Sequence, residues 1–361
     1  MPSLWSYPVV AFVAVALLLP LAVRLAHSKG FVDLPGGRKR HEGEVPPVGG
    51  LVIFPVFAGV ALWHGIEPQQ GWLLGALALL LLLGALDDRI NVPAWAKFTV
   101  QWIAALIIVI PGHAVAYSMG NLLGFGPFGW GPGAQVFSAI AAVLLINAIN
   151  LMDGLDGLAG GVGFIVLFWF TVCAQWTGKA FALPLPLILM GALAGFLAHN
   201  MRYPGHARAT VFMGDAGSLA LGLSLAWFAM HFSQYPDSVL KPVSVAWLLA
   251  LPIYDTCGQF ARRVSQGRHP FDADQHHFHH HFIFAGLTPG KSTAAILALC
   301  FVTGMIGVYG IRLGLPEYVL GYLWIVLLLG HIYMSMRPHR YRRLLSALRG
   351  GKADNDNAGR A

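Results

Sequence analysis

The stretch GWLLGALALLLLLGALDDR, residues 71–89, decides the fold class of this chain. Residues 71–86 carry no charged side chain and consist mainly of leucine, as in a segment that crosses a bilayer. Backbone polar groups inside a bilayer must be satisfied within the segment, so such a run has to be helical. The stretch therefore predicts a membrane helix that ends in two adjacent carboxylates, Asp87 and Asp88.

The composition extends this prediction to the whole chain. Of 361 residues, 57% are hydrophobic and only 11% are charged, against about 25% in a typical soluble domain. These values exclude an ordinary soluble enzyme, a disordered regulator and a secreted disulfide scaffold. Continuous apolar runs such as 319–330 also differ from the alternating segments of about 10 residues in a membrane β-barrel. We therefore expect an all-α, polytopic integral membrane protein.

The distribution of basic residues predicts the topology. The first apolar run, 4–26, is followed rather than preceded by positive charges, which argues against a cleaved signal peptide and places the N-terminus outside. Counting from there predicts about eleven spans, with 20 of the 23 Lys and Arg residues and the C-terminus in the cytoplasm. The predicted spans are 4–26, 49–65, 71–86, 98–117, 134–150, 159–177, 181–200, 217–232, 243–262, 292–311 and 318–336. We expect one transmembrane domain, 1–340, and a basic, then disordered tail, 341–361.

Five polar clusters fall on the predicted cytoplasmic side. In the first, Asp87 and Asp88 end a helix, where negative charge is unfavourable. Three interpretations are open: a cation offsets that charge in the folded protein, one carboxylate acts as a base, or both are solvated loop acids. The second cluster is NAINLMDGLDG, residues 147–157, whose amides and acids recur every third residue. Its glycines favour a broken helix in which the backbone approaches a ligand.

The other three clusters suit anionic ligands. In FMGDAGS, residues 212–218, Asp215 is either a helix cap or a carboxylate that shares Mg²⁺ with a phosphate. The histidines of HPFDADQHHFHHH, 269–281, either bind a transition metal or, as we prefer, bind phosphate and handle protons near neutrality. The basic loop 32–50 either orients the chain or binds phosphates.

The placement of the clusters separates three classes of function. A channel would carry polar groups along its whole length, and a transporter would concentrate them near mid-membrane. Here they gather at one interface, as in an enzyme that joins a water-soluble donor to a lipid acceptor. Acids, a divalent cation and basic groups together indicate phosphoryl chemistry. For the basic C-terminal segment, the anionic membrane surface is a better partner than nucleic acid.

The set of motifs resembles the polyprenyl-phosphate N-acetylhexosamine-1-phosphate transferases of glycosyltransferase family 4. The resemblance spans about 250 residues and is carried by VDLPGGRKRH and PPVGG (32–50), LDDRINVPAWAK (86–97), NAINLMDGLDGLAGG (147–161), FMGDAGS (212–218), LPIYDT (251–256) and HPFDADQHHFHHHF (269–282). Within the family, the first loop and the spaced histidines are similar to the WecA-like, undecaprenyl-phosphate GlcNAc-1-phosphate transferase branch. Gln275 stands where that branch usually has arginine.

The resemblance implies a Mg²⁺- or Mn²⁺-dependent reaction of a UDP-N-acetylhexosamine with undecaprenyl phosphate, giving the lipid diphospho-sugar and UMP. It places this first membrane step of cell-envelope polysaccharide synthesis in the bacterial inner membrane, at its cytoplasmic face. The roles that it implies are catalytic for Asp87, Asp88, Asp153 and Asp156, metal-binding for Asp215, Asp87 and Asp88, and substrate-binding for Arg38, Lys39, Lys97, Asn150, Phe212, His277, His279 and His280.

Several alternatives stay open at this point. Within the family, the chain could transfer phospho-N-acetylmuramoyl-pentapeptide, or use UDP-GalNAc or UDP-QuiNAc as the donor. Outside enzymes, the alternative is a transporter for a nucleotide sugar or a lipid-linked sugar. A homodimer is possible, and the sequence does not decide between direct attack and a covalent intermediate.

Overall fold

The computed structural model describes residues 3–33, 43–234, 238–269 and 276–348, and this part of the chain is helical. Within it there is no β-strand, only three isolated β-bridges. The helices are α1 (Ser6–Ser28), α2 (Gly49–His64), α3 (Pro68–Ile90), α4 (Ala94–Val109), η1 (Gly131–Gly133), α5 (Ala134–Met152), α6 (Leu158–Trp176), η2 (Ala180–Ala182), α7 (Pro184–Asn200), α8 (Gly214–Ser233), α9 (Pro242–Leu248), α10 (Ala250–Ser265), α11 (Phe278–Phe284), α12 (Pro289–Arg312), α13 (Glu317–Ser335) and α14 (Pro338–Leu348).

Every predicted span overlaps a helix, and the all-α prediction is confirmed for the described residues. Among these residues, seven helical segments are long and apolar enough to cross a membrane, as expected for a multi-pass membrane protein. They are Ser6–Ser28, Gly131–Met152, Leu158–Trp176, Ala180–Asn200, Gly214–Ser233, Pro289–Arg312 and Glu317–Ser335. The apolar helices α2 and α4 are shorter, with 16 residues each. The count of eleven spans and the orientation of the termini remain predictions.

The structure departs from the predicted boundaries where proline intervenes. The predicted ninth span, 243–262, is divided into α9 and α10 at Leu249, three residues before Pro252. Proline lacks a backbone donor and is tolerated in the first turn of a helix, where it lies in α10. Similarly, α4 ends at Val109 rather than 117, just before Pro111. Residues 341–348, predicted as tail, belong to α14.

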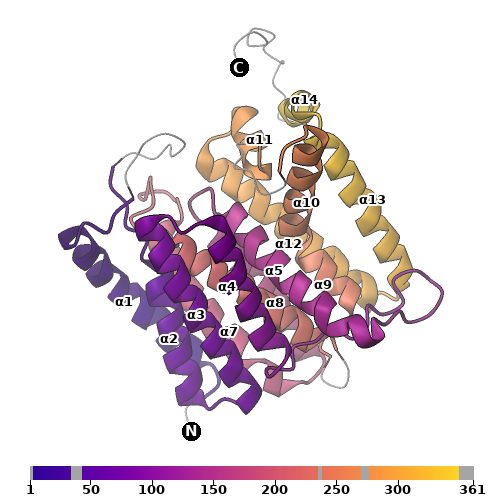
Figure 1. Ribbon diagram of the computed structural model, residues 1–361, viewed down its shortest axis with the longest axis horizontal. Helices are drawn as coiled ribbons and strands as arrows, with labels where there is room; N and C mark the ends of the chain where they lie inside the picture. Colours follow the sequence, from indigo (N-terminus) through magenta and orange to yellow (C-terminus); the bar gives the residue numbers. More distant parts are fainter. Residues whose placement is uncertain (1–2, 34–42, 235–237, 270–275, 349–361) are drawn as a thin grey trace.

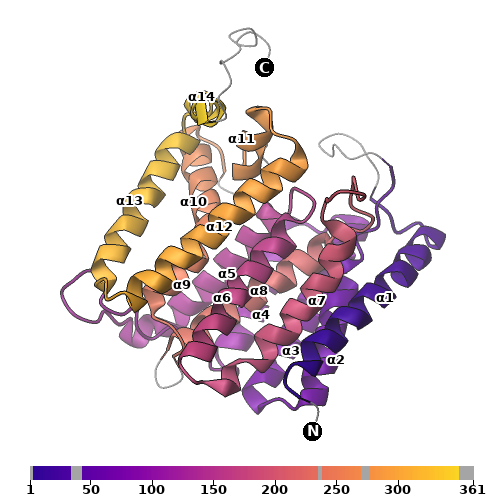
Figure 2. The same ribbon diagram turned by 180° about the vertical axis from the view of Figure 1, so that it is seen from behind.

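Helix α8 lies at the centre of the bundle. In an 18-residue apolar stretch of α8, 94% of the residues are buried, whereas the corresponding shares are 22% in α1 and 17% in α13. Helices α1 and α13 lie at opposite edges of the bundle (Figures 1 and 2). The edge helices expose large apolar side chains such as Leu17 and Val326, as lipid-facing helices do. In Figure 1, α11 and α14 lie at the end of the bundle opposite the N-terminus. We call this end, which also carries the N-terminus of α8, the site end.

Glycines bring α2 and α3 unusually close to α8. A β-carbon on Gly84 of α3 would lie 2.1 Å from the backbone nitrogen of Ala216, and one on Gly50 of α2 would lie 2.2 Å from Gly217. Small residues at helix contacts allow such backbone approach in membrane proteins. Since Asp87 and Asp88 lie one turn beyond Gly84, this contact carries them to the N-terminus of α8, beside Asp215.

Candidate active site

A cavity of about 820 Å³ opens at the site end. Its walls contain residues from all five polar clusters, so the structure brings these clusters together as the sequence predicts. The predicted site residues that line it are Asp87, Asp88, Lys97, Asn150, Asp153, Asp156, Phe212, Asp215, His277, His279 and His280. Arg38, Lys39 and Gln275 lie outside the described residues.

Asp87 is held in a fixed, charge-compensated position. Its carboxylate accepts hydrogen bonds from Lys97 Nζ at 2.6 Å and from the backbone N–H of Val92 at 2.8 Å, and the residue is only 6% exposed. The cation that offsets negative charge at the end of α3 is therefore Lys97, in the first turn of α4. This ion pair ties the two helices together and gives Lys97 a partner other than a substrate phosphate.

Asp215 is not the cap of α8. Its side-chain Oδ1 accepts from Asn150 Nδ2 at 2.9 Å, and the same amide group also donates to Ser218 Oγ at 2.9 Å. Instead, Asp88 Oδ1 accepts from the backbone N–H of Asp215 at 3.1 Å, at the start of the helix. The interpretation of Asp215 as a mere helix cap is therefore wrong, and its carboxylate is oriented toward the cavity floor by α5.

The carboxylates form a set of oxygen donors that fits a hard cation. The carboxyl groups of Asp87 and Asp215 lie close enough to influence each other's protonation, so a shared proton or a cation between them would relieve their repulsion. In the described ranges, no three His, Cys, Asp or Glu side chains make a ready-made metal cage. Mg²⁺ is usually held by one or two carboxylates together with substrate phosphates, so Asp87, Asp88 and Asp215 suit this ion without a complete cage.

Asp153 has a strongly perturbed acidity. It follows α5, in the loop that the glycines of the second cluster break open. Burial raises its pKa to about 7, and the negative charges of Asp88 and Asp156 contribute further. A carboxyl group with a pKa near the working pH is suited to proton transfer, whereas a bound cation would lower this pKa.

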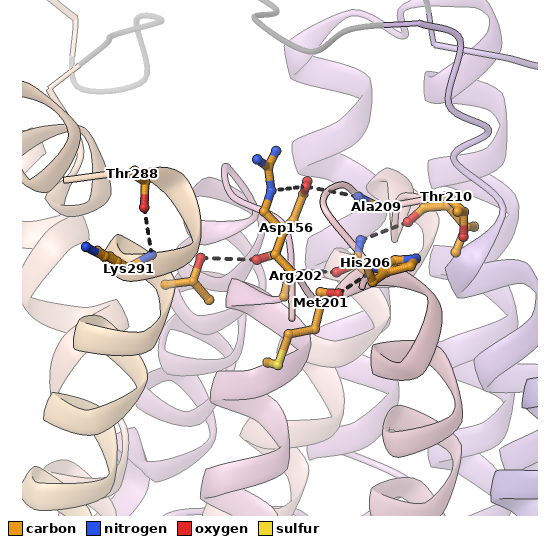
Figure 3. Close-up of polar contacts among 12 residues, drawn as sticks. Asp156, Met201, Arg202, His206, Ala209, Thr210, Thr288 and Lys291 are labelled. Carbon is orange, nitrogen blue, oxygen red and sulfur yellow. Dashed lines mark hydrogen bonds and ion pairs between the residues drawn. The ribbon is translucent and has the colours of Figure 1, made fainter. Parts of the chain in front are cut away.

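Asp156 has a different environment from Asp153. Its Oδ2 accepts from Arg202 Nε at 2.7 Å and from the backbone N–H of Ala209 at 3.1 Å (Figure 3). Its backbone carbonyl accepts from Thr293 Oγ1 of α12 at 3.1 Å. Asp156 thus joins the loop after α5, the loop after α7 and the start of α12, and it orients Arg202 at the cavity wall.

The histidines close one side of the cavity. His277 Nδ1 lies 3.2 Å from Asp255 Oδ2, while Asp255 Oδ1 accepts from the backbone N–H of Phe278 at 2.8 Å. His279 is packed so tightly against Gly154 that any side chain at this glycine would collide with the ring. Burial, together with the charge of His280, lowers the pKa of His279 to about 3. The expectation that the histidines titrate near neutrality therefore fails at His279, whose ring is uncharged at neutral pH.

Phe212 lies at the cavity wall on a rigid support. Its backbone pairs with the end of the first loop, since Phe212 N donates to Pro46 O at 3.0 Å and Gly49 N donates to Phe212 O at 2.9 Å. The ring is partly exposed and lines the cavity. It is therefore accessible to a ligand.

Known proteins resemble this chain in sequence over most of its length. Residues 71–233 match the protein family described as "Glycosyl transferase family 4". An undecaprenyl-phosphate alpha-N-acetylglucosaminyl 1-phosphate transferase from Escherichia coli O157:H7 is 30% identical over 352 residues, which cover 94% of this chain and 92% of the relative. The chain belongs to glycosyl transferase family 4.

Two further relatives have the same name as the Escherichia coli protein. The protein from Yersinia pestis is 30% identical over 90% of this chain and 89% of its own length. That from Haemophilus influenzae is 32% identical over 86% of each chain. The family 4 match ends at residue 233, so it contains the aspartates and Asn150 but not the histidines. The three-dimensional structure is what adds the histidines to the same cavity.

Sequence reasoning on this family 4 member missed several polar residues of the site, among them Arg202 and Asp255. Arg202 lines the cavity but has no distinguishing motif, and as one more basic residue of a polar loop it gave no signal. Asp255 lies in the matching motif LPIYDT, yet no role was assigned to it because its partners, His277 and Phe278, are more than 20 residues away in the chain. Only the fold shows what each of them contacts.

Proposed function

We propose that this family 4 protein transfers N-acetylglucosamine 1-phosphate from UDP-GlcNAc to undecaprenyl phosphate. An oxygen of the lipid phosphate attacks the sugar-bearing phosphorus, the bond between the two phosphates of the donor breaks, and UMP leaves. The product is undecaprenyl-diphospho-GlcNAc. The observation that carries this proposal is the single cavity that unites the aspartates and histidines, in a chain matching transferases of this name over 94% of its length.

The acid cluster is suited to hold a divalent cation. Asp215, with Asp87 and Asp88, would bind Mg²⁺, or Mn²⁺ in its place. When bound, the ion would neutralise charge on the donor diphosphate and on the phosphoryl group in transfer. The protein supplies the geometry: Asn150 orients the Asp215 carboxylate, and Lys97 together with the Val92 amide fixes Asp87.

Asp153 is the best-supported proton acceptor of the site. The last proton of the lipid phosphate dissociates with a pKa of about 6, as in other phosphomonoesters. A carboxylate with a pKa of about 7 can take this proton as the phosphate oxygen attacks. Asp87 is a weaker candidate for this step because Lys97 and a backbone amide stabilise its charged form.

The remaining predicted residues would bind the donor. Phe212 offers a ring face to uracil, and the N–H groups of His277, His279 and His280 suit the diphosphate. Arg202, aimed by Asp156, adds a guanidinium that matches phosphate geometry. Asp156 therefore acts by positioning Arg202 rather than by contact with the reacting atoms. Arg38 and Lys39 remain proposed phosphate contacts.

The location of the cavity favours a membrane-bound transferase over a transporter. A transport pathway would need polar groups near the middle of the bundle, whereas this cavity lies at one end. We place this end at the cytoplasmic face of the inner membrane, where the basic residues concentrate and a UDP-sugar is available.

The direct test is a donor comparison with purified protein in detergent. Undecaprenyl phosphate and Mg²⁺ are combined separately with UDP-GlcNAc, UDP-GalNAc and UDP-N-acetylmuramoyl-pentapeptide, and the lipid product is identified by mass spectrometry. We expect undecaprenyl-diphospho-GlcNAc and one UMP per lipid formed. Product from the pentapeptide donor alone would assign the chain to the other branch, and no lipid product from any donor would refute the proposed function.

A further inference from the structure

Helix α11, which carries the histidines, is held on two sides. On one side, Asp255 of α10 accepts from the backbone N–H of Phe278 at the first residue of the helix and contacts His277. A helix of seven residues is too short to be stable by itself. The positions of its side chains therefore depend on what it packs against.

On the other side, α11 rests on Tyr341 of α14. The rings of Tyr341 and His281 are stacked, with centroids 4.5 Å apart and an interplanar angle of 28°. Tyr341 is only 7% exposed, and its hydroxyl lies 3.3 Å from Nδ1 of His331 on α13. The ring of Phe278 also lies 6.2 Å from that of Tyr341. One side chain thus connects α14 with both α11 and α13.

His281 differs from the histidines that precede it. His279 and His280 line the cavity, whereas His281 is 1% exposed and does not line it. Within the described residues, neither ring nitrogen of His281 has a hydrogen-bond partner. Burial lowers its pKa to about 3, so the ring is uncharged and packs as an aromatic group. Stacking on Tyr341 is therefore the contact that fixes this side of the helix.

A second contact continues the same interface. The guanidinium carbon of Arg342 lies 4.5 Å from the centroid of the Phe284 ring, at the last residue of α11. Such cation–π contacts are attractive, so this one holds the last turn of α11 against α14. The α14 helix therefore contacts α11 at Phe278, His281 and Phe284, along the length of the short helix.

We propose that Tyr341 is a positioning residue for the transfer reaction. It does not line the cavity but, through His281, fixes α11 so that His279 and His280 face the donor phosphates. This inference rests on the proposed function, because it assigns a task to the same histidines. It also gives α14 a part in the active site, although the helix lies far beyond the family 4 match and begins after the last apolar span.

The test compares two substitutions of Tyr341 with a matched control. Tyr341→Phe keeps the ring and loses the hydroxyl, whereas Tyr341→Ala loses the stack. Tyr318→Ala makes the same truncation at a partly exposed tyrosine of α13, near the opposite end of the bundle. With UDP-GlcNAc and undecaprenyl phosphate, we expect kcat to fall about tenfold or more in Tyr341→Ala, as for a misplaced reactive group, and to stay near wild type in Tyr341→Phe and Tyr318→Ala.

A double-mutant cycle separates positioning from general stability. If Tyr341 acts through the histidines, Tyr341→Ala should add little to the loss caused by replacing both His279 and His280 with alanine, because the groups that it positions are already absent. Losses that multiply independently would overturn the inference, as would wild-type kcat in Tyr341→Ala. Tyr341→Leu, which retains apolar volume, replaces the alanine variant if that variant does not fold. Absence of lipid product in the wild type would instead refute the proposed function.

Discussion

The closest helix contact in the site offers a sharp perturbation. In Gly84→Ala, the new β-carbon would lie 2.1 Å from the backbone nitrogen of Ala216 and 2.5 Å from the carbonyl carbon of Asp215. Non-bonded heavy atoms prefer about 3.5–4.0 Å, so α3 and α8 must separate locally by about 1 Å or more. The atoms in the way are backbone atoms, which cannot rotate aside as a flexible side chain would.

This separation should damage activity more than folding. Overpacking typically costs about 1–3 kcal/mol of stability, but a displacement of about 1 Å in a catalytic arrangement can cost about 100-fold in rate. The displaced groups are Asp87 and Asp88, one turn beyond Gly84, relative to Asp215. We therefore expect Gly84→Ala to remain folded in detergent, with a lowered thermal midpoint, and to lose about 100-fold in the rate of lipid diphospho-GlcNAc formation.

The same helix provides the control. A β-carbon on Gly75 would have no atom within 4 Å, so Gly75→Ala tests the same substitution in α3 without the clash. Initial rates and thermal midpoints are measured for both variants and the wild type in the same detergent. Equal rates in Gly84→Ala and wild type would refute the claim that this close approach sets the geometry of the acids.

Three further predictions concern individual groups of the cavity. Asp153 has a pKa of about 7 instead of the usual 3.8, so the folded protein loses stability as pH rises between these values. In metal-free buffer, Asp153→Asn should therefore be more thermally stable than the wild type at pH 8 but not at pH 4. An equal difference in thermal midpoint at both pH values would contradict the raised pKa. Phe212→Ala should weaken UDP binding by about 1–3 kcal/mol if the ring stacks on uracil, measured by calorimetry, whereas unchanged binding would make Phe212 a packing residue. Asp156→Asn and Arg202→Gln should each raise KM for UDP-GlcNAc, and the double variant should lose little more than either single one; additive losses in these steady-state rates would show that the two residues act separately.

Hydropathy was sufficient for the main features of the fold. Leucine-rich runs such as 71–86 predicted the helices, because a bilayer leaves the backbone few alternatives. It did not predict how the helices end: α3 continues to Ile90, and the span around Leu249 is broken. A sliding average of hydrophobicity does not register one proline that removes a backbone donor. Nor did it predict α14, which contacts α11 and α13 through Tyr341.

The composition of the site was also largely predictable, but its internal pairing was not. Polar residues at one membrane face had to lie near one another, and the cavity contains eleven of the predicted residues. Their partners depend on distances of a few ångströms between helices. Lys97 was predicted to contact a phosphate, and the structure adds an ion pair with Asp87. Asp156 was predicted to be catalytic, and the structure adds an ion pair with Arg202, a residue that no motif had marked. The predicted roles of both residues stay predictions.

The central claim is that the acid cluster around Asp215 performs sugar-phosphate transfer, and Asp215→Asn tests it most directly. The substitution keeps the shape of the side chain and removes its charge. Ser224→Ala serves as the control, since its hydroxyl bonds only within α8, to Ala220 O. Formation of undecaprenyl-diphospho-GlcNAc is measured for the wild type and both variants over a range of Mg²⁺ concentrations. We expect near-normal rates for Ser224→Ala and a loss of about 100- to 1,000-fold for Asp215→Asn, as when one charge-stabilising group is removed. A wild-type rate in Asp215→Asn would contradict the central claim.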